Sequence, residues 1–320
     1  MKEPIEPASH LKVSLVATVK DAAPFIGEFL ASVRSQTRPP DEVVVVDGGS
    51  SDGTLDLLQD AGELTVIEAP GANIARGRNL AVAAATHDVI AVTDADCGLE
   101  PDWLERLLEP IARGADVSMG FYRPVADSLL QVCMASVLPT RDEVRAPRFM
   151  PSARSLAFLR EAFDAAGGYP EWLDVGEDMH LNHRWRGLGL RMELASDALV
   201  RWRIRPTLGA TWRQYVGYAR GDAVAGMHAR RHAIRFVVYG AAATVLASRR
   251  PLPLAAAAVA GAAYVRRPVR RGMRLATERG RSRVAAALLT PAAIAFIDAA
   301  KMAGYVSGLR RRWRQGNRAS

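Results

Sequence analysis

The residues best suited to chemistry are two aspartates at the end of an apolar run. Residues 89–93 are apolar and mostly β-branched or small, and Asp94 and Asp96 follow them one residue apart. Unpaired charge is costly inside a protein, so a buried strand is expected to end in acids only where they bind something. Mg²⁺ and Mn²⁺ prefer oxygen ligands and are commonly held by one or two carboxylates with substrate phosphates. The pattern therefore predicts a divalent-cation site for a phosphate-bearing substrate.

Short apolar runs alternate with helical patterns over the first 121 residues, and these elements must position the acids. Amphipathic spacing predicts a helix with Pro24 in its first turn and further helices at 74–85 and 101–111. Strands are expected at 11–17, 42–46, 64–68, 89–93 and 117–121. Such alternation predicts an α/β fold with a mostly parallel sheet sandwiched by helices. Ligands bind outside the carboxyl ends of such strands, so Asp47 and Asp94 should converge there.

The pattern is less regular over residues 122–200. Helices are expected at 129–138, 156–166 and 177–186, and short strands at 191–194 and 198–204. The helix at 177–186 has acids in its first turn and Arg184 and Arg186 in its last, which complements the helix dipole.

Charge divides the chain into an acidic and a basic part. Residues 201–320 hold 24 Lys and Arg against three acids, a formal charge of +21, whereas residues 1–200 carry −13. A basic segment of this size predicts an anionic partner, either nucleic acid or the cytoplasmic face of a membrane. The composition, 49% hydrophobic and 24% charged, indicates a packed protein, and two cysteines favour a reducing, cytosolic setting.

Three apolar, alanine-rich runs lie within the basic part. Residues 236–248 and 252–265 flank Arg249-Arg250-Pro251, and a longer run at 284–306 is interrupted by two charged residues. The first two runs are too short to span ~30 Å of hydrocarbon as straight helices. They fit a shallow hairpin or helices in the membrane plane with arginines at the headgroups, and a buried helical subdomain is the alternative. Bases interleaved with apolar residues favour lipid over nucleic acid as the partner.

Six ordered blocks along the chain resemble a known family. They are the segments 13–18 and 43–54, Gly77-Arg78-Asn79, Asp94-Ala95-Asp96, Gly167-Gly168-Tyr169-Pro170 and Gly176-Glu177-Asp178. In this order they resemble the family 2 glycosyltransferases over residues 11–225. The resemblance implies a GT-A fold with a nucleotide-sugar half at 11–121 and an acceptor half at 122–225. A basic, apolar, α-helical and membrane-associated region at 226–320 would follow it.

The resemblance implies a donor site in the first half. Asp47 would recognise the nucleobase, and Thr18 and Lys20 would add nucleotide contacts. Arg76 and Arg78 lie near a helix N-terminus and would bind the diphosphate, because Arg forks and helix-end amides both favour phosphate. The alternatives are a turn residue for Asp47 and solvated surface residues for the arginines.

The resemblance also implies a metal site. Asp94 would contact the ribose or the water shell of the metal, and Asp96 would bind Mn²⁺ or Mg²⁺ directly. The metal would stabilise the departing nucleoside diphosphate as a Lewis acid. Similar enzymes often carry a His close to the position of Trp202. Its absence leaves the third metal ligand open.

In the acceptor half, Asp178 matches the family's general base, which removes a proton from the acceptor hydroxyl. Glu177 would assist through hydrogen bonds, and the alternative is that both acids complement a helix dipole. A single carboxylate base suits one displacement with inversion at the sugar carbon. Arg220 lies in a segment similar to one that closes over the donor, so it would meet the diphosphate, with an interfacial arginine as the alternative.

These residues lead to one interpretation of function. The chain is expected to be an inverting, metal-dependent glycosyltransferase of the hexosyltransferase type that uses a UDP- or GDP-sugar. The acceptor would be lipid-linked or a glycan of the cell envelope, with the catalytic domain on the cytoplasmic side of the membrane and no nucleic-acid partner. A nucleotidyltransferase is one alternative, although residues 17–24 contain no glycine for a phosphate loop. A non-catalytic protein that binds an anionic surface is the other.

Overall fold

The computed structural model describes residues 11–145 and 149–316, and these form two compact units. The first unit combines the chain up to residue 125 with residues 140–203, and the second combines residues 126–139 with the chain from 204 onward. This division differs from the predicted domain boundary at residue 225. The reason is that helix α8 (Leu208–Val224) packs along the C-terminal helix α11 (Arg283–Gly316) within the second unit.

An eight-stranded sheet forms the centre of the first unit, in the order β3-β2-β1-β4-β7-β6-β8-β5. Its strands are β1 (Val13–Val19), β2 (Glu42–Asp47), β3 (Thr65–Glu68), β4 (Val89–Asp94), β5 (Cys97–Leu99), β6 (Val117–Val125), β7 (Leu156–Leu159) and β8 (Met192–Arg203). Strands β1 to β4 pair in parallel, as predicted. Beyond β4 the sheet is mixed, since β7 runs antiparallel to both of its neighbours and β5 runs antiparallel to β8.

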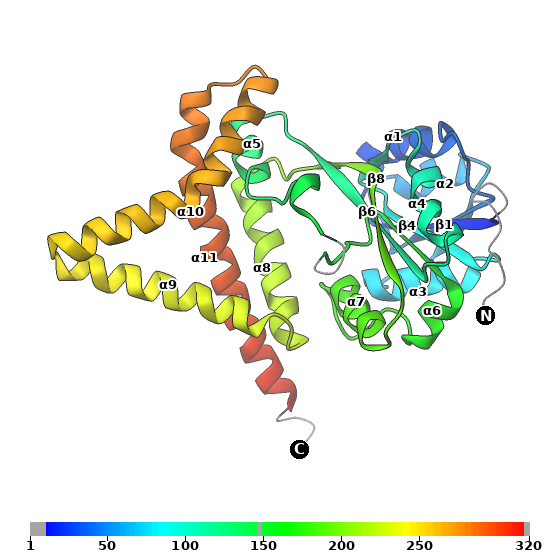
Figure 1. Cartoon of the computed structure of the whole chain (residues 1–320). Helices are drawn as coiled ribbons and strands as arrows, with labels where there is room; N and C mark the ends of the chain where they lie inside the picture. The colour runs from blue at the N-terminus through cyan, green and yellow to red at the C-terminus, as the bar shows by residue number, and fades with distance from the viewer. Residues whose placement is uncertain (1–10, 146–148, 317–320) are drawn as a thin grey trace. The chain divides into compact units, whose positions relative to one another are not determined.

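Helices cover both faces of this sheet (Figure 1). One face carries α3 (Ile74–Ala84), α6 (Arg160–Ala165) and α7 (Glu177–Gly187), and the other carries α1 (Ala23–Arg34), α2 (Thr54–Gln59) and α4 (Trp103–Ala112). A short 3₁₀ helix spans Arg141–Glu143. Apolar side chains at helical spacing face the sheet, and Trp103 and Trp185 are completely buried on α4 and α7.

The predictions for two segments of the first unit are wrong. Residues 156–166 were expected to form one helix, but they form the strand β7 followed by the short helix α6. The apolar residues of β7 pair with β4 on one side and β6 on the other, and this pairing outweighs helical propensity. The two short strands expected at 191–194 and 198–204 are one strand, β8, with a register shift along its pairing with β6.

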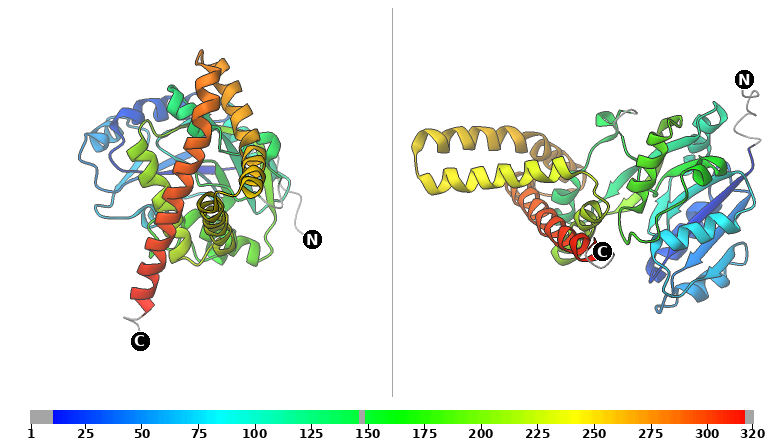
Figure 2. Two further views of the ribbon diagram at one scale, coloured as in Figure 1. Left: turned by 90° about the vertical axis from the view of Figure 1, so that its left-hand side faces the viewer. Right: turned by 90° about the horizontal axis from the view of Figure 1, so that it is seen from below.

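The second unit is helical. It consists of α5 (Leu129–Ala135), α8, α9 (Ala229–Ser248), α10 (Pro251–Glu278) and α11. Helices α8 and α11 lie very close together, because a Cβ atom on Gly308 would stand only 2.5 Å from the carbonyl oxygen of Arg220. Helix α9 and the first part of α10 form a hairpin whose arms meet at its tip and which projects from α8 and α11 (Figures 1 and 2).

Most of the large apolar side chains that the described residues expose lie in this helical unit. Val237 of α9 is 69% exposed, Leu252 at the hairpin tip 82%, and Val259 of α10 71%. Among the described residues, α11 is the one helix long and apolar enough to cross a membrane, and 39% of its apolar window is buried inside the protein. The predicted apolar runs are therefore helices, and those of the hairpin are exposed.

A polar network explains the acid that interrupts the apolar run at 284–306. Asp298 of α11 accepts hydrogen bonds from Arg235 at 2.6 Å and from Tyr239 at 3.1 Å, both on α9. His232 of α9 lies 2.8 Å from the carboxylate of Asp222 on α8. These contacts satisfy the polar groups where α8, α9 and α11 meet, and they fix the base of the hairpin.

Candidate active site

The carboxyl edge of the parallel strands gathers the first group of predicted residues. In the sheet register Val19 of β1 lies opposite Asp47 of β2, and Thr18 lies opposite Asp94 of β4. The two aspartates therefore flank the end of β1, where the alternating pattern placed them. Thr18 is half-buried there and Lys20 is exposed.

The carboxylate of Asp47 closes the turn that follows β2. The side chain is 2% exposed and accepts hydrogen bonds from the backbone N–H groups of Gly49 and Ser50, both at 2.8 Å, and from the Ser50 hydroxyl at 2.6 Å. These contacts match the turn alternative for Asp47, and the expected nucleobase contact stays a prediction.

Helix α3 approaches the same edge closely. A Cβ atom on Gly77 would lie 3.0 Å from Cγ2 of Thr18, so glycine permits this approach. Asn73 caps the helix by accepting a hydrogen bond from the N–H of Arg76 at 2.9 Å. The Arg76 side chain is exposed in the first turn, which leaves it accessible to a ligand.

Arg78 links two acids that are far apart in the chain. Its side chain is almost completely buried, and its guanidinium donates to Asp94 at 2.6 Å and to Glu177 through a second, very short contact. Burial alone would lower the pKa of Arg78, but the charges of Asp94 and Glu177 outweigh burial and raise it. The expected diphosphate contact of Arg78 is not what this geometry favours, because two carboxylates already engage the guanidinium.

Hydrogen bonds join two of the sequence blocks, Gly77-Arg78-Asn79 and Gly167-Gly168-Tyr169-Pro170. Asn79 accepts a hydrogen bond from the N–H of Tyr169 at 2.9 Å and donates one to its carbonyl oxygen at 2.9 Å. Gly168 has a φ of +68°, and a Cβ atom there would crowd the Asn79 side chain at 3.1 Å. This paired contact places the start of α7, with Glu177 and Asp178, beside α3.

The first turn of α7 carries the two remaining predicted acids. Burial, with a smaller contribution from the charge of Asp178, raises the pKa of Glu177 to about 7, and the charge of Arg78 opposes this shift. Asp178 is half-buried, and its carboxylate accepts hydrogen bonds from the N–H of Met179 at 2.7 Å and of Ala153 at 3.3 Å. The site thus holds one acid inside the protein and a second at its surface.

Sequence reasoning missed Arg154. Its Nε lies 3.7 Å from Asp94 Oδ2, and its guanidinium stacks 4.2 Å from the centre of the Trp202 ring. Trp202 itself pairs with Cys97 across β8 and β5, so it lies one residue along from Asp96. Similar enzymes often carry His close to this position, which lies next to the Asp94-Ala95-Asp96 block. In this chain the position is occupied by the buried indole of Trp202, which is covered by the guanidinium of Arg154.

The described residues contain no group of three or more His, Cys, Asp or Glu side chains arranged to hold a metal. A cation would therefore depend on Asp94 and Asp96 together with oxygens of its ligand, which is the arrangement that Mg²⁺ and Mn²⁺ commonly accept. The two carboxylates supply only oxygen donors, and this donor set fits a hard divalent cation.

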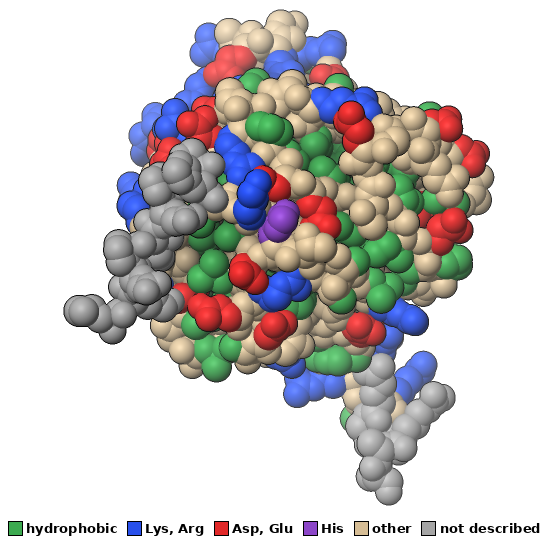
Figure 3. Space-filling model, turned by 90° about the vertical axis from the view of Figure 1, so that its right-hand side faces the viewer, with side chains coloured by type: hydrophobic (Ala, Val, Ile, Leu, Met, Phe, Trp, Pro, Cys, Tyr) green, Lys and Arg blue, Asp and Glu red, His purple; other side chains and the backbone are tan. Residues whose placement is uncertain are grey.

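Arg220 lies on α8 in the second unit, where it lines a pocket with residues of α9 and α11. Among the described residues, the lining of that pocket contains arginines but no acid. On the face shown in Figure 3, by contrast, acidic, basic and apolar side chains are mixed. Ion pairs such as Arg106–Glu109 at 3.1 Å lie on the surface of the first unit.

Comparisons with known proteins identify similar sequences. The glycosyl transferase family 2 model matches residues 14–137. The chain is similar to glycosyltransferase AglE of Haloferax volcanii, with 27% identity over 199 residues, which are 58% of this chain and 65% of the relative. It is also similar to O-antigen chain rhamnosyltransferase RfbN of Salmonella typhimurium, with 24% identity over 220 residues, 60% of this chain and 66% of the relative. The matched regions thus span slightly less than two thirds of each relative.

The fold resembles that of mannosyltransferase PcManGT from Pyrobaculum calidifontis, solved in complex with GDP-Man and Mn²⁺. The TM-score is 0.55 at 22% identity, covering 95% of this chain and 89% of that one. Residues 14–137 thus match the family 2 glycosyltransferases, and the helix-covered sheet has the GT-A fold.

Proposed function

We propose that this protein transfers a sugar from a nucleotide-diphosphate sugar to a hydroxyl group of an acceptor, with inversion at the anomeric carbon. The observation that carries the proposal is the contact of Arg78 with both Asp94 and Glu177. This contact brings the strand-end acids and the first turn of α7 to one edge of the sheet. A donor bound at the strand ends then has Asp178 available to an acceptor.

Asp178 acts as the general base. Its half-buried carboxylate takes the proton of the acceptor hydroxyl while that oxygen attacks the anomeric carbon and the nucleoside diphosphate departs. The hydrogen bonds from Met179 and Ala153 orient the carboxylate. Arg78 and Glu177 are positioning residues, since they hold β4 and α7 together without touching the reacting atoms.

The donor lies along the edge formed by β1, β2 and α3. Thr18, Lys20 and the Asp47 turn face the nucleoside, and the exposed Arg76 faces the phosphates at the start of α3. Asp96, with Asp94, would hold Mn²⁺ or Mg²⁺. When bound, that cation supplies Lewis-acid stabilisation of the departing diphosphate. Arg154 adds a fixed positive charge beside Asp94.

The acceptor is a lipid-linked molecule or a cell-envelope glycan, and the enzyme works at the cytoplasmic side of a membrane. The exposed apolar residues of α9 and α10 and the charge of +21 on residues 201–320 support binding to an anionic lipid surface. The relative from Salmonella is an O-antigen chain rhamnosyltransferase, and such a relative supports a polysaccharide product.

The test is donor turnover by the purified full chain with Mn²⁺ and a panel of UDP- and GDP-sugars. Replacing Asp178 with Asn should lower turnover by about 10²–10⁴-fold, because the base is lost while the shape is kept. Asp164→Asn is the matched control, since Asp164 is exposed on α6. Unchanged turnover in Asp178→Asn, or no turnover of any nucleotide sugar by the unmodified chain, would reject the proposal.

A further inference from the structure

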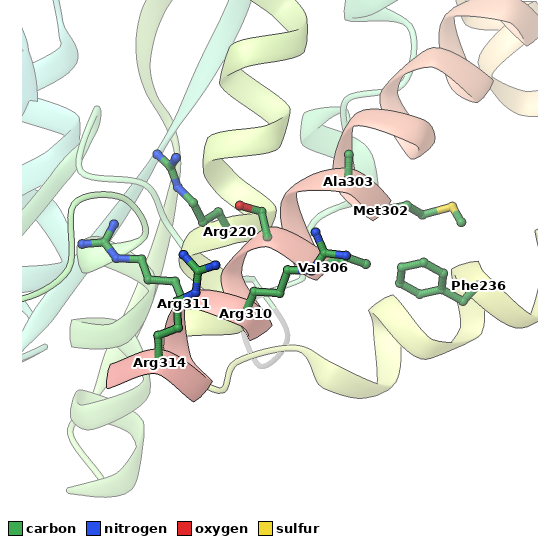
Figure 4. Close-up of a pocket in the computed structure, with 9 residues that line it drawn as sticks. Arg220, Phe236, Met302, Ala303, Val306, Arg310, Arg311 and Arg314 are labelled. Carbon is green, nitrogen blue, oxygen red and sulfur yellow. The ribbon is translucent and has the colours of Figure 1, made fainter. Parts of the chain in front are cut away.

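The helical unit contains a pocket of about 960 Å³ between α8, α9 and α11. Four arginines line it: Arg220 on α8 and Arg310, Arg311 and Arg314 on α11. Arg220, Arg311 and Arg314 gather at one end, and Arg310 lies between them and the opposite end (Figure 4). The size is that of a pocket for a small organic ligand.

The positive charge of this pocket is not balanced from within. The described residues that line it include no acid. Arg220, Arg310 and Arg314 have no ion-pair or hydrogen-bond partner among the residues that the structure describes. Like charges gathered in a concave site raise the local concentration of anions, and arginine forks match the oxygens of a phosphate. An anionic ligand that entered the pocket would supply the counter-charge that its described lining residues lack.

The other end of the pocket is apolar. Phe236 of α9 and Met302 and Val306 of α11 form it, with Arg310 next to them (Figure 4). Other apolar residues of α9 are open to the surroundings, since Ile234 is 54% exposed and Val238 57%. The helix that supplies Phe236 to the pocket can therefore also contact hydrocarbon through its outer side. A free anion would leave the apolar end of the pocket uncovered.

We propose that the pocket binds a phosphorylated lipid, with its phosphate or diphosphate among the arginines and its hydrocarbon along Phe236, Met302 and Val306. The inference rests on the proposed function and names the acceptor class: a sugar acceptor carried on a lipid phosphate. It also gives Arg220 a different ligand from the donor diphosphate that the sequence suggested. The anionic head and the hydrocarbon tail then occupy the two ends of one pocket.

The experiment measures binding to the full chain in neutral detergent micelles by isothermal titration. Three probes separate the parts of the ligand: farnesyl phosphate, farnesol as the tail alone and inorganic phosphate as the head alone. Farnesyl phosphate should bind saturably and about ten-fold or more tightly than either part. Equal affinity for inorganic phosphate would overturn the proposal in favour of a free-anion site.

Matched variants locate the binding. Arg220→Gln with Arg310→Gln should weaken farnesyl phosphate by about ten-fold or more. Arg266→Gln with Arg267→Gln removes the same charge from exposed positions of α10 and should change little. Phe236→Ser should weaken binding, whereas Val237→Ser, the exposed neighbour, should not. Equal losses in both arginine pairs would show general charge attraction and overturn the proposal.

Binding of a nucleoside diphosphate distinguishes this pocket from the donor site. The Arg220 and Arg310 variant should bind UDP and GDP as the unmodified chain does. If it loses nucleoside diphosphate and keeps farnesyl phosphate, the arginines serve the donor and the proposal is wrong. Asp178→Asn should keep farnesyl phosphate binding even though transfer is lost, so failure of the proposed reaction and failure of the lipid site give different results.

Discussion

Arg78 Nη2 lies 2.6 Å from Asp94 Oδ1, and this ion pair joins α3 to the end of β4 inside the first unit. The second contact of the same guanidinium, to Glu177, extends the link to α7. All three side chains are largely shielded from water, so each charge depends on the others. The cluster therefore has consequences for stability as well as for catalysis.

Replacing Arg78 with Met should destabilise the protein strongly. The variant leaves Asp94 and Glu177 without their buried counter-charge, which costs about 3–5 kcal/mol for a broken buried pair. Chemical denaturation followed by circular dichroism measures the loss. Arg106→Met is the control, because its contacts to Asp102 and Glu109 are half-exposed on α4 and such pairs contribute at most about 1 kcal/mol. A loss for Arg78→Met no larger than the control's would contradict the buried cluster.

The raised pKa of Glu177 predicts a pH-dependent effect of Glu177→Gln. The unfolded carboxyl ionises near 4.5, while the folded one keeps its proton to about 7. The unmodified protein therefore loses stability as pH rises between these values, by about 3 kcal/mol at 1.36 kcal/mol per pKa unit. Gln does not titrate, so the variant should gain relative stability by up to that amount between about pH 4.5 and pH 8.

Unfolding free energies of both proteins at the two pH values test this expectation, and their difference cancels the other titrating groups. Glu63→Gln is the control, since the side chain of Glu63 is 79% exposed. A constant difference between variant and parent across the range, or a gain at low pH, would refute the predicted shift.

Two glycine substitutions should change stability in opposite directions. In Gly308→Ala the new Cβ atom would stand 2.5 Å from the Arg220 carbonyl and 2.6 Å from the Ala223 methyl, so α8 and α11 must separate. We expect a loss of about 1–3 kcal/mol. Gly240→Ala on α9 meets nothing within 4 Å and should gain about 1 kcal/mol from helix propensity. Thermal unfolding of the two variants compares them directly, and a neutral Gly308→Ala would argue against the close crossing.

The exposed hairpin predicts binding to lipid vesicles. Leu252→Asp with Val259→Asp places charge at two of its most exposed apolar positions and should reduce co-sedimentation with vesicles of phosphatidylcholine and phosphatidylglycerol by about ten-fold or more. Leu57→Asp is the control, because Leu57 is an exposed apolar residue of the first unit. Unchanged sedimentation of the hairpin variant would place the lipid contact elsewhere.

The sequence predicted the parallel half of the sheet well, because each strand there is an apolar run bounded by turn residues. It failed at residues 156–166, where Leu156, Leu159 and Phe163 have helical spacing. The pairing of β7 with β4 and β6 decides its conformation, and that pairing joins segments far apart in the chain. The spacing of apolar residues within one short segment does not reveal which distant strands will pair with it.

Local sequence patterns also predicted only part of the site. The order of the short sequence blocks identified four of its acids, Asp94, Asp96, Glu177 and Asp178. Arg154 belongs to none of these blocks. It reaches Asp94 because it lies just before β7, which is the strand next to β4. For Arg78 the residue type predicted an anionic partner but not which anion, and the structure supplies carboxylates where phosphate was expected.

The two strands that pair with β6 determine the shortest fragment of this chain that can fold. The family model ends at residue 137, yet β6 has only β7 and β8 beside it, and both follow residue 155. A protein cut at the end of the matched segment would leave β6 without either adjacent strand and Arg78 without one of its two acids. The region that sequence comparison delimits is thus shorter than the region that must fold as a whole, and expression of the shorter piece should yield an aggregating chain.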